Sequence, residues 1–265
     1  DADLHTILFM GVDTESAQTA SEGEYMGRGG RCDTIILLVL NKKEKTMQMV
    51  ELSRNAIVPV DEYDEDRNYI ATADMQISMQ FAFSDSLSRG SYIMKNKVSE
   101  TLMGIRINDY LTMTLGGIRK VVDGLGGVTI TMEDDCTYLD PSYTKGAVIE
   151  MDGEAAERFV RYRDITDLGS NENTRMVRQT WFIKQFFSQM RGISNSKIVE
   201  VFEDAEGYVE TDTSLETLSG LLKYELEDET LVIPGTVQEG KYDEFYIDEA
   251  GMQKMLLEIL YEEAE

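Results

Sequence analysis

The chain has 265 residues, of which 50 are acidic and 25 basic, so that its formal net charge is -25. This acidic balance argues against nucleic-acid binding, because such proteins need a broad basic footprint. One histidine, His5, and two cysteines outside any metal-ligand spacing argue against a zinc site and a histidine-based catalytic triad. A hydrophobic content of 42% and only three prolines predict a single domain over residues 1–265.

Hydrophobic patterns predict the elements in chain order. Two continuously apolar runs, 7–12 and 35–40, are typical of central strands that are covered on both faces. Further strands are predicted at 47–52, 109–115, 128–132, 230–233 and 244–247, the last as a short edge strand, and helices at 92–103, 154–161, 173–190, 214–224 and 249–261. The acidic segment 60–68 is predicted to be a solvated loop. The mixture indicates an α/β fold with a mixed central sheet sandwiched between helices.

Positive charge is concentrated between residues 158 and 191. This segment contains Arg158, Arg161, Arg163, Arg175, Arg178, Arg191 and Lys184, against only three carboxylates. Arg175 and Arg178 are three residues apart on a predicted helix, so they share a face, with Gln179 beside them. Arginine binds phosphate oxygens through paired hydrogen bonds and keeps its charge at ordinary pH. We predict an anionic ligand here, whereas Arg158 and Arg191 are expected to form ordinary solvated ion pairs.

Two aspartates flank the predicted central strands. Asp13 follows the first apolar run and Asp33 precedes the second, so both carboxylates can emerge at one rim of the sheet. Hard oxygen ligands at such a rim suit Mg²⁺, which takes one or two carboxylates and keeps several waters. The alternative for each aspartate is a turn or cap residue.

Six short motifs occur in the same order as in the LytR-CpsA-Psr family. They are the stretch 7–13, Gly30-Arg31-Cys32-Asp33-Thr34, Ser53-Arg54, the stretch 123–128, the spaced motif from Gly153 to Arg163, and Arg175-x-x-Arg178-Gln179. The whole chain resembles the extracytoplasmic catalytic domain of that family. The resemblance implies an enzyme on the outer face of the membrane in mainly Gram-positive bacteria, with an anchor that this chain lacks. It also implies transfer of teichoic acid or capsular polysaccharide from a polyprenyl pyrophosphate carrier to peptidoglycan, with Mg²⁺ as cofactor.

The resemblance also suggests roles for individual residues. Asp13 and Asp33 are expected to bind the metal, and Asp33, Arg54 and Arg163 to be catalytic. Asp33 is in addition the candidate for activating the acceptor hydroxyl, although a metal ligand is a poor base. The residues expected to bind substrate phosphate are Arg31, Arg54, Arg161, Arg163, Arg175, Arg178 and Gln179.

The sequence departs from the family pattern in lacking the proline before Arg54 and at three further positions. Asn55 stands where the family has an aspartate, and Gln76 and Ser78 stand where it commonly has a lysine and an asparagine. These changes favour keeping a noncatalytic polyprenyl-phosphate-binding or regulatory module as the alternative. A nucleotide hydrolase is disfavoured because the sequence has no P-loop.

Other features of the sequence leave alternatives open. The apolar stretches 75–83, 103–113 and 181–190 fit plain core better than a slot for lipid. Cys32 and Cys136 could pair or stay reduced.

Overall fold

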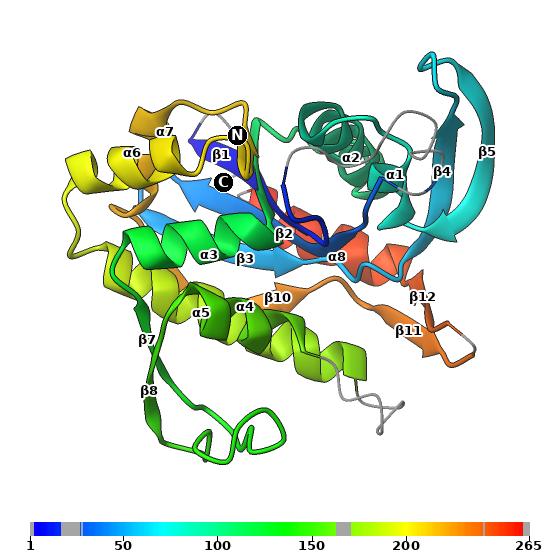
Figure 1. Ribbon diagram of the computed structural model, residues 1–265. Helices are drawn as coiled ribbons and strands as arrows, with labels where there is room; N and C mark the ends of the chain where they lie inside the picture. Colours follow the sequence, from blue (N-terminus) through cyan, green and yellow to red (C-terminus); the bar gives the residue numbers. More distant parts are fainter. Residues whose placement is uncertain (1–2, 17–26, 28, 163–170, 241, 262–265) are drawn as a thin grey trace. The chain divides into compact units, whose positions relative to one another are not determined.

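The computed structural model describes residues 3–16, 27, 29–162, 171–240 and 242–261 (Figure 1). The chain forms two compact units, each described by itself. Unit 1 comprises Asp1–Thr114, Gly207–Ser214 and Tyr224–Glu265, and unit 2 comprises Leu115–Glu206 and Leu215–Lys223.

Unit 1 is built on a six-stranded mixed sheet. Its strands lie in the order β10 (Glu225–Val232), β3 (Thr46–Glu51), β2 (Cys32–Asn41), β1 (Leu4–Val12), β6 (Asp109–Thr114) and β9 (Val209–Thr211). β1 is antiparallel to β2 and parallel to β6, while β3 is antiparallel to β2 and parallel to β10. The prediction of a mixed α/β fold with the two apolar runs as central strands is confirmed.

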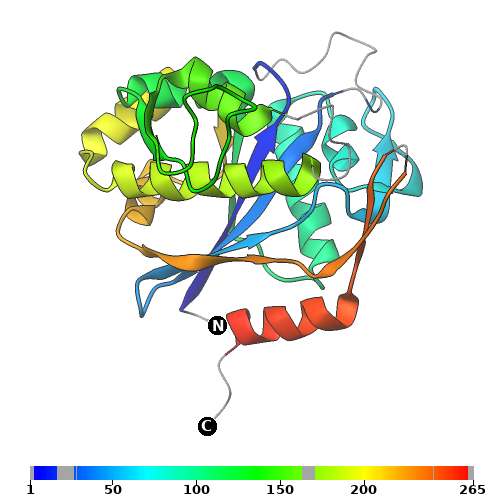
Figure 2. The same cartoon turned by 90° about the horizontal axis from the view of Figure 1, so that it is seen from below.

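The core of unit 1 lies on one face of this sheet. Leu8, Met10 and Leu37 pack there in one cluster with helices α2 (Leu87–Thr101) and α8 (Glu249–Leu260), the latter red in Figure 2. Residues that alternate onto the other face, such as Ile36 and Met49, are buried as well. β1 to β3 are therefore buried on both faces, which is why they read as continuous apolar runs. The stretch 75–83, which contains α1 (Met79–Ala82), belongs to the same core cluster.

Two hairpins extend unit 1 beyond the main sheet. One pairs β4 (Ile57–Tyr63) with β5 (Tyr69–Gln76), and the other pairs β11 (Gly235–Gln238) with β12 (Glu244–Ile247). The predicted loop over 60–68 was therefore wrong for 60–63, which lie in β4. The partly exposed, acidic β4–β5 hairpin has too few buried positions to show a clear strand pattern. The strand at 244–247 is confirmed, but as part of a separate hairpin.

Unit 2 is mainly helical. It contains α3 (Leu115–Gly124), α4 (Gly153–Arg161), α5 (Asn171–Met190), α6 (Asn195–Asp204) and α7 (Leu215–Leu221), with a hairpin of β7 (Val128–Thr131) and β8 (Val148–Met151). α5 contacts both α4 and β7. Asp152 caps the amino-terminal end of α4, because its carboxylate accepts a hydrogen bond from the Ala155 amide. Within the described residues no helix combines the length and the apolar character that a membrane span needs.

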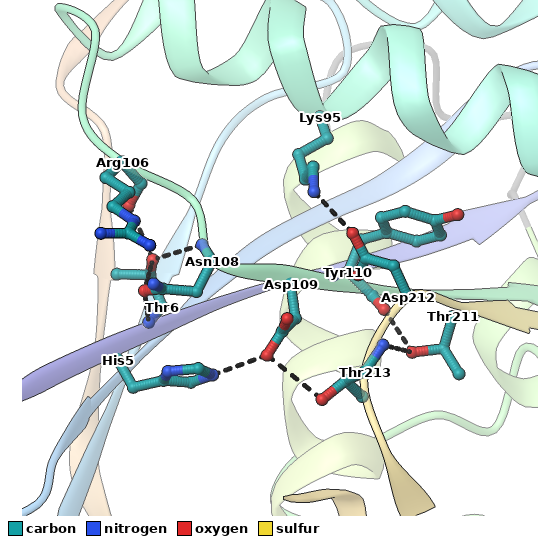
Figure 3. A network of polar contacts seen from close by, with 10 residues as sticks. All are labelled: His5, Thr6, Lys95, Arg106, Asn108, Asp109, Tyr110, Thr211, Asp212 and Thr213. Atoms are coloured by element: carbon teal, nitrogen blue, oxygen red, sulfur yellow. Dashed lines mark hydrogen bonds and ion pairs between the residues drawn. The ribbon is translucent and has the colours of Figure 1, made fainter.

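A polar network joins the edge strand β9 to the sheet at the amino-terminal ends of β1 and β6 (Figure 3). Asp109 binds His5 Nε2 at 2.7 Å and accepts a hydrogen bond from Thr213. Asp212 accepts bonds from the Tyr110 amide and from Lys95 Nζ, both at 2.6 Å. The single histidine of the chain thus has a structural partner at the end of β1 opposite to Asp13.

Candidate functional site

A β-bulge places Asp33 at the end of the sheet. Gly11 pairs with Thr34 and Val12 with Cys32, so Asp33 is the extra residue between them. Under strict alternation Asp33 would point to the same face as Ile35 and would enter the apolar core. The bulge gives that place to Cys32, which is buried in the core cluster, and re-aims the carboxylate. Burial, assisted by the adjacent Asp33 charge, raises the pKa of the Cys32 thiol well above its usual value.

Asp13 lies directly after β1, beside Asp33. Its Oδ1 accepts a hydrogen bond from the Arg31 amide at 2.5 Å, and its own amide donates to the Arg31 carbonyl at 3.1 Å. Gly30 permits this approach, because its φ is +92° and a Cβ there would come within 2.3 Å of Thr14. Burial raises the pKa of the Asp13 carboxyl, and the negative charge of Asp33 adds to this, whereas the bond from Arg31 lowers it.

Arg54 binds the same cluster from the turn that follows β3. Its Nη1 forms an ion pair with Asp33 Oδ1, and only 10% of its side chain is exposed. The predicted meeting of Asp13 and Asp33 at one rim is therefore present, with Arg31 and Arg54 beside them. Of these residues, Asp13 and Arg31 are exposed, whereas Asp33 and Arg54 are partly buried.

In unit 2, Arg178 and Gln179 bind the carboxyl-terminal end of α4. Arg178 donates from Nε to the Phe159 carbonyl at 3.1 Å and from Nη2 to the Tyr162 carbonyl. Gln179 Nε2 donates to the Val160 carbonyl at 3.2 Å. The last carbonyls of a helix have no partner within the helix, so α5 caps α4 with these two side chains. Arg178 Nη1 also donates to the Tyr138 hydroxyl at 2.7 Å and lies over its ring.

The other arginines of unit 2 differ in exposure. Arg175 and Arg178 are each 2% exposed, which fits the predicted shared face of α5. Arg161 is 62% exposed and makes an i,i+4 ion pair with Glu157 at 3.2 Å. The predicted catalytic and phosphate-binding residue Arg163 lies outside the described residues.

The structure therefore gives two arginine-containing clusters, one in each unit. Asp13, Arg31, Asp33 and Arg54 meet in unit 1, while Arg175, Arg178 and Gln179 share a face in unit 2. The phosphate-binding and catalytic roles of the individual residues remain predictions. Sequence reasoning missed Tyr138, which precedes the six-arginine segment and carried no signal of its contact with Arg178. Both cysteines are buried and free.

Solved structures share this fold along nearly the whole chain. The crystal structure of B. subtilis TagV has a TM-score of 0.72 and 23% sequence identity, with 99% of each chain covered. The structure described as TagT bound to LI-WTA has a TM-score of 0.69 at 20% identity and covers 97% of this chain and 89% of that one. These likenesses place the chain in a class of α/β proteins built on this mixed sheet.

A family model described as the LytR_cpsA_psr family matches residues 1–256. The chain belongs to this family, and the match runs through both units.

Curated relatives are similar at the level of sequence. The "Polyisoprenyl-teichoic acid--peptidoglycan teichoic acid transferase TagV" of Bacillus subtilis (strain 168) is 25% identical over 217 residues, which are 78% of this chain and 49% of the relative. "Biofilm regulatory protein A" of Streptococcus mutans serotype c (strain ATCC 700610 / UA159) is 25% identical over 229 residues, 83% of this chain and 53% of the relative. The chain thus spans about half the length of these relatives.

Proposed function

We propose that this chain is the catalytic domain of a transferase that moves a glycopolymer from a polyprenyl pyrophosphate carrier to peptidoglycan. The observation that carries the proposal is the cluster of Asp13, Asp33 and Arg54 at the end of β1 and β2, in a chain of the LytR_cpsA_psr family. The name of the relative TagV, a teichoic acid transferase that acts on peptidoglycan, supports the same reaction class. Such a reaction takes place outside the cytoplasm, with the protein held at the membrane by an anchor.

The chemistry asked of the site is transfer of a phosphoryl-linked glycan. The acceptor hydroxyl attacks the phosphorus next to the sugar and gives up its proton to water. The bond to the bridging oxygen breaks, and polyprenyl phosphate leaves with the additional negative charge. Arg54 would bind these phosphate oxygens, with Asp33 fixing the direction of its guanidinium. In unit 2, Arg178 is fixed by the end of α4 and would be an oriented cation for phosphate by itself. With water in place of the acceptor, the same step is hydrolysis of the pyrophosphate.

Asp13 and Asp33 fit a magnesium ion. Burial raises the pKa of Asp13 and the negative charge of Asp33 raises it further, and a divalent cation would relieve the repulsion between the two carboxylates. Among the described residues no group of three or more acidic, histidine or cysteine side chains could hold a metal. Two carboxylates are nevertheless sufficient for Mg²⁺, whose other ligands are commonly waters and phosphate. When bound, the ion would stabilise the negative charge that develops on the phosphate oxygens.

Magnesium-dependent turnover of a polyprenyl pyrophosphate tests this proposal. We expect the wild-type chain to release phosphate, Arg54→Ala to lower kcat about 10²- to 10³-fold, and Asp13→Ala to weaken Mg²⁺ binding in calorimetry. Arg67→Ala is the matched control, because Arg67 also pairs with a carboxylate, Asp85, but is 60% exposed. Binding of the lipid without turnover by the wild type would instead support a regulatory lipid-binding module, which the similarity to Biofilm regulatory protein A keeps as the second candidate.

A further inference from the structure

Arg54 is carried by a tight turn whose geometry depends on its neighbours. The Ala56 amide donates to the Ser53 carbonyl at 3.1 Å, and the Asn55 amide donates to Ser53 Oγ at 3.3 Å. Arg54 and Asn55 are thus the two central residues of the turn. Asn55 is only 5% exposed, so its side chain acts inside the protein.

Gln76, the last residue of β5, binds this turn through its side-chain amide. Its Nε2 donates to Asn55 Oδ1 at 3.1 Å and to the Asp243 carbonyl at 2.9 Å. A primary amide has two N–H donors, so these two bonds use both. The Phe245 amide also donates to the Asn55 carbonyl at 2.9 Å, and Asn55 is therefore held by both its side chain and its backbone.

The residues after Gln76 extend this contact toward Asp33. The Ser78 amide donates to the Arg54 carbonyl at 3.2 Å, and the Ser78 carbonyl accepts from the Cys32 amide at 3.3 Å. Ser78, two residues after the end of β5, therefore binds both Arg54, which carries the guanidinium, and Cys32, which precedes its carboxylate partner Asp33. A change in the position of Gln76 would reach both members of the Arg54–Asp33 ion pair.

We propose that Gln76 is a positioning residue that fixes Arg54 for the reaction by clamping its turn between β5 and the segment 243–245. The inference rests on the proposed function. It gives a meaning to two departures from the family pattern, because Asn55 and Gln76 contact each other. An aspartate and a lysine at these positions would form an ion pair in the same place. The amide pair keeps the bond and avoids the desolvation of two buried charges.

Gln76→Glu tests the clamp. It keeps the shape of the side chain, but it replaces the amide donor with a carboxylate oxygen that faces two acceptors, Asn55 Oδ1 and the Asp243 carbonyl. We expect kcat for a polyprenyl pyrophosphate to fall about tenfold or more, as for residues that orient a catalytic group, with the donor KM nearly unchanged. Gln48→Glu is the matched control, because Gln48 Nε2 also donates to two carbonyls in unit 1, those of Met49 and Glu229. The double variant Asn55→Asp with Gln76→Lys should restore kcat. Equal kcat for the Gln76 and Gln48 variants would overturn the proposal.

A second readout does not depend on the reaction. Amide hydrogen exchange at Phe245 and Ser78 should be faster in Gln76→Glu than in Gln48→Glu, because opening of the clamp exposes both amides. If the wild type shows no turnover, the proposed function fails, while exchange still tests the clamp. Unchanged protection in the Gln76 variant would reject it. Should the Glu variants not fold, Gln76→Met and Gln48→Met remove the same donors without adding charge.

Discussion

Arg54 and Arg178 are both buried and both oriented by oxygen atoms, but the oxygens differ in charge. Arg54 binds the carboxylate of Asp33, whereas Arg178 binds two backbone carbonyls and the hydroxyl of Tyr138. The ion pair of Arg54 offsets its charge, while the neutral partners of Arg178 orient its charge without cancelling it. An arginine also has five N–H donors, so three bonds do not exhaust Arg178.

The two clusters therefore differ in the net charge that they offer to an anion. In unit 1 two aspartates face two arginines, Arg31 and Arg54, so the formal charges of the four side chains sum to zero. Added Mg²⁺ would make that cluster positive. Arg178 presents positive charge from the protein alone. Binding of a phosphate at the cluster in unit 1 should therefore depend more strongly on Mg²⁺ than binding at Arg178.

The largest expected effect is at the charged pair. Asp33→Asn removes the ion pair between Asp33 and Arg54, and we expect the free energy of unfolding to fall by about 2 to 3 kcal/mol, in the upper part of the range for a hydrogen bond to a charged group. Relief of the repulsion between Asp33 and Asp13 offsets part of the loss. Urea unfolding measures it, with Asp85→Asn as the control for an exposed pair, which should lose less than about 1 kcal/mol. Equal losses would mean that the Arg54 pair is no stronger than a surface one.

Removal of the neutral contacts should have a somewhat smaller effect. Arg178→Ala leaves the Phe159 and Tyr162 carbonyls without this donor, and we expect a loss of about 2 kcal/mol, within the range for unsatisfied buried groups. Arg178→Lys should recover only part of it, because one ammonium cannot reproduce the planar fork. Thermal unfolding measures both variants. Arg158→Ala, on the exposed side of α4, is the control and should stay close to wild type.

The smallest effect is expected at Tyr138. Tyr138→Phe keeps the ring under the guanidinium but removes one of the three acceptors, so about 1 kcal/mol of unfolding free energy should be lost, as for one ordinary hydrogen bond. Turnover should fall much less than in Arg178→Ala, because the two carbonyl contacts remain. A Tyr138→Phe variant as inactive as Arg178→Ala would show that the hydroxyl itself takes part in the reaction.

The sequence predicted most of the central sheet because its strands are covered on both faces and their apolar runs are unbroken. It also predicted that Asp13 and Asp33 meet, since each is at the end of such a run. The hairpin of β4 and β5 was missed in part, because few of its side chains are buried. α3, which follows β6 without a break, was missed as well.

The contacts of the arginines could not be predicted from spacing. From their spacing, Arg178 and Gln179 were predicted to bind phosphate. The structure shows that the same side chains cap α4, a contact that depends on how α4 and α5 pack together. The pairing of Asn55 with Gln76 joins residues 21 positions apart through a hairpin whose register the sequence did not reveal. These are tertiary contacts, which local patterns do not encode.

Because Asp33 is the extra residue of a β-bulge, the number of residues between Gly30 and Thr34 determines which face of the sheet its side chain occupies. Deleting Arg31 or Cys32 would remove the bulge and turn the Asp33 carboxylate into the apolar interior, whereas a substitution would leave the alternation of the strand unchanged. Related sequences should therefore seldom differ in the number of residues along this stretch. A gap there would mark a member that has lost the acid from its site.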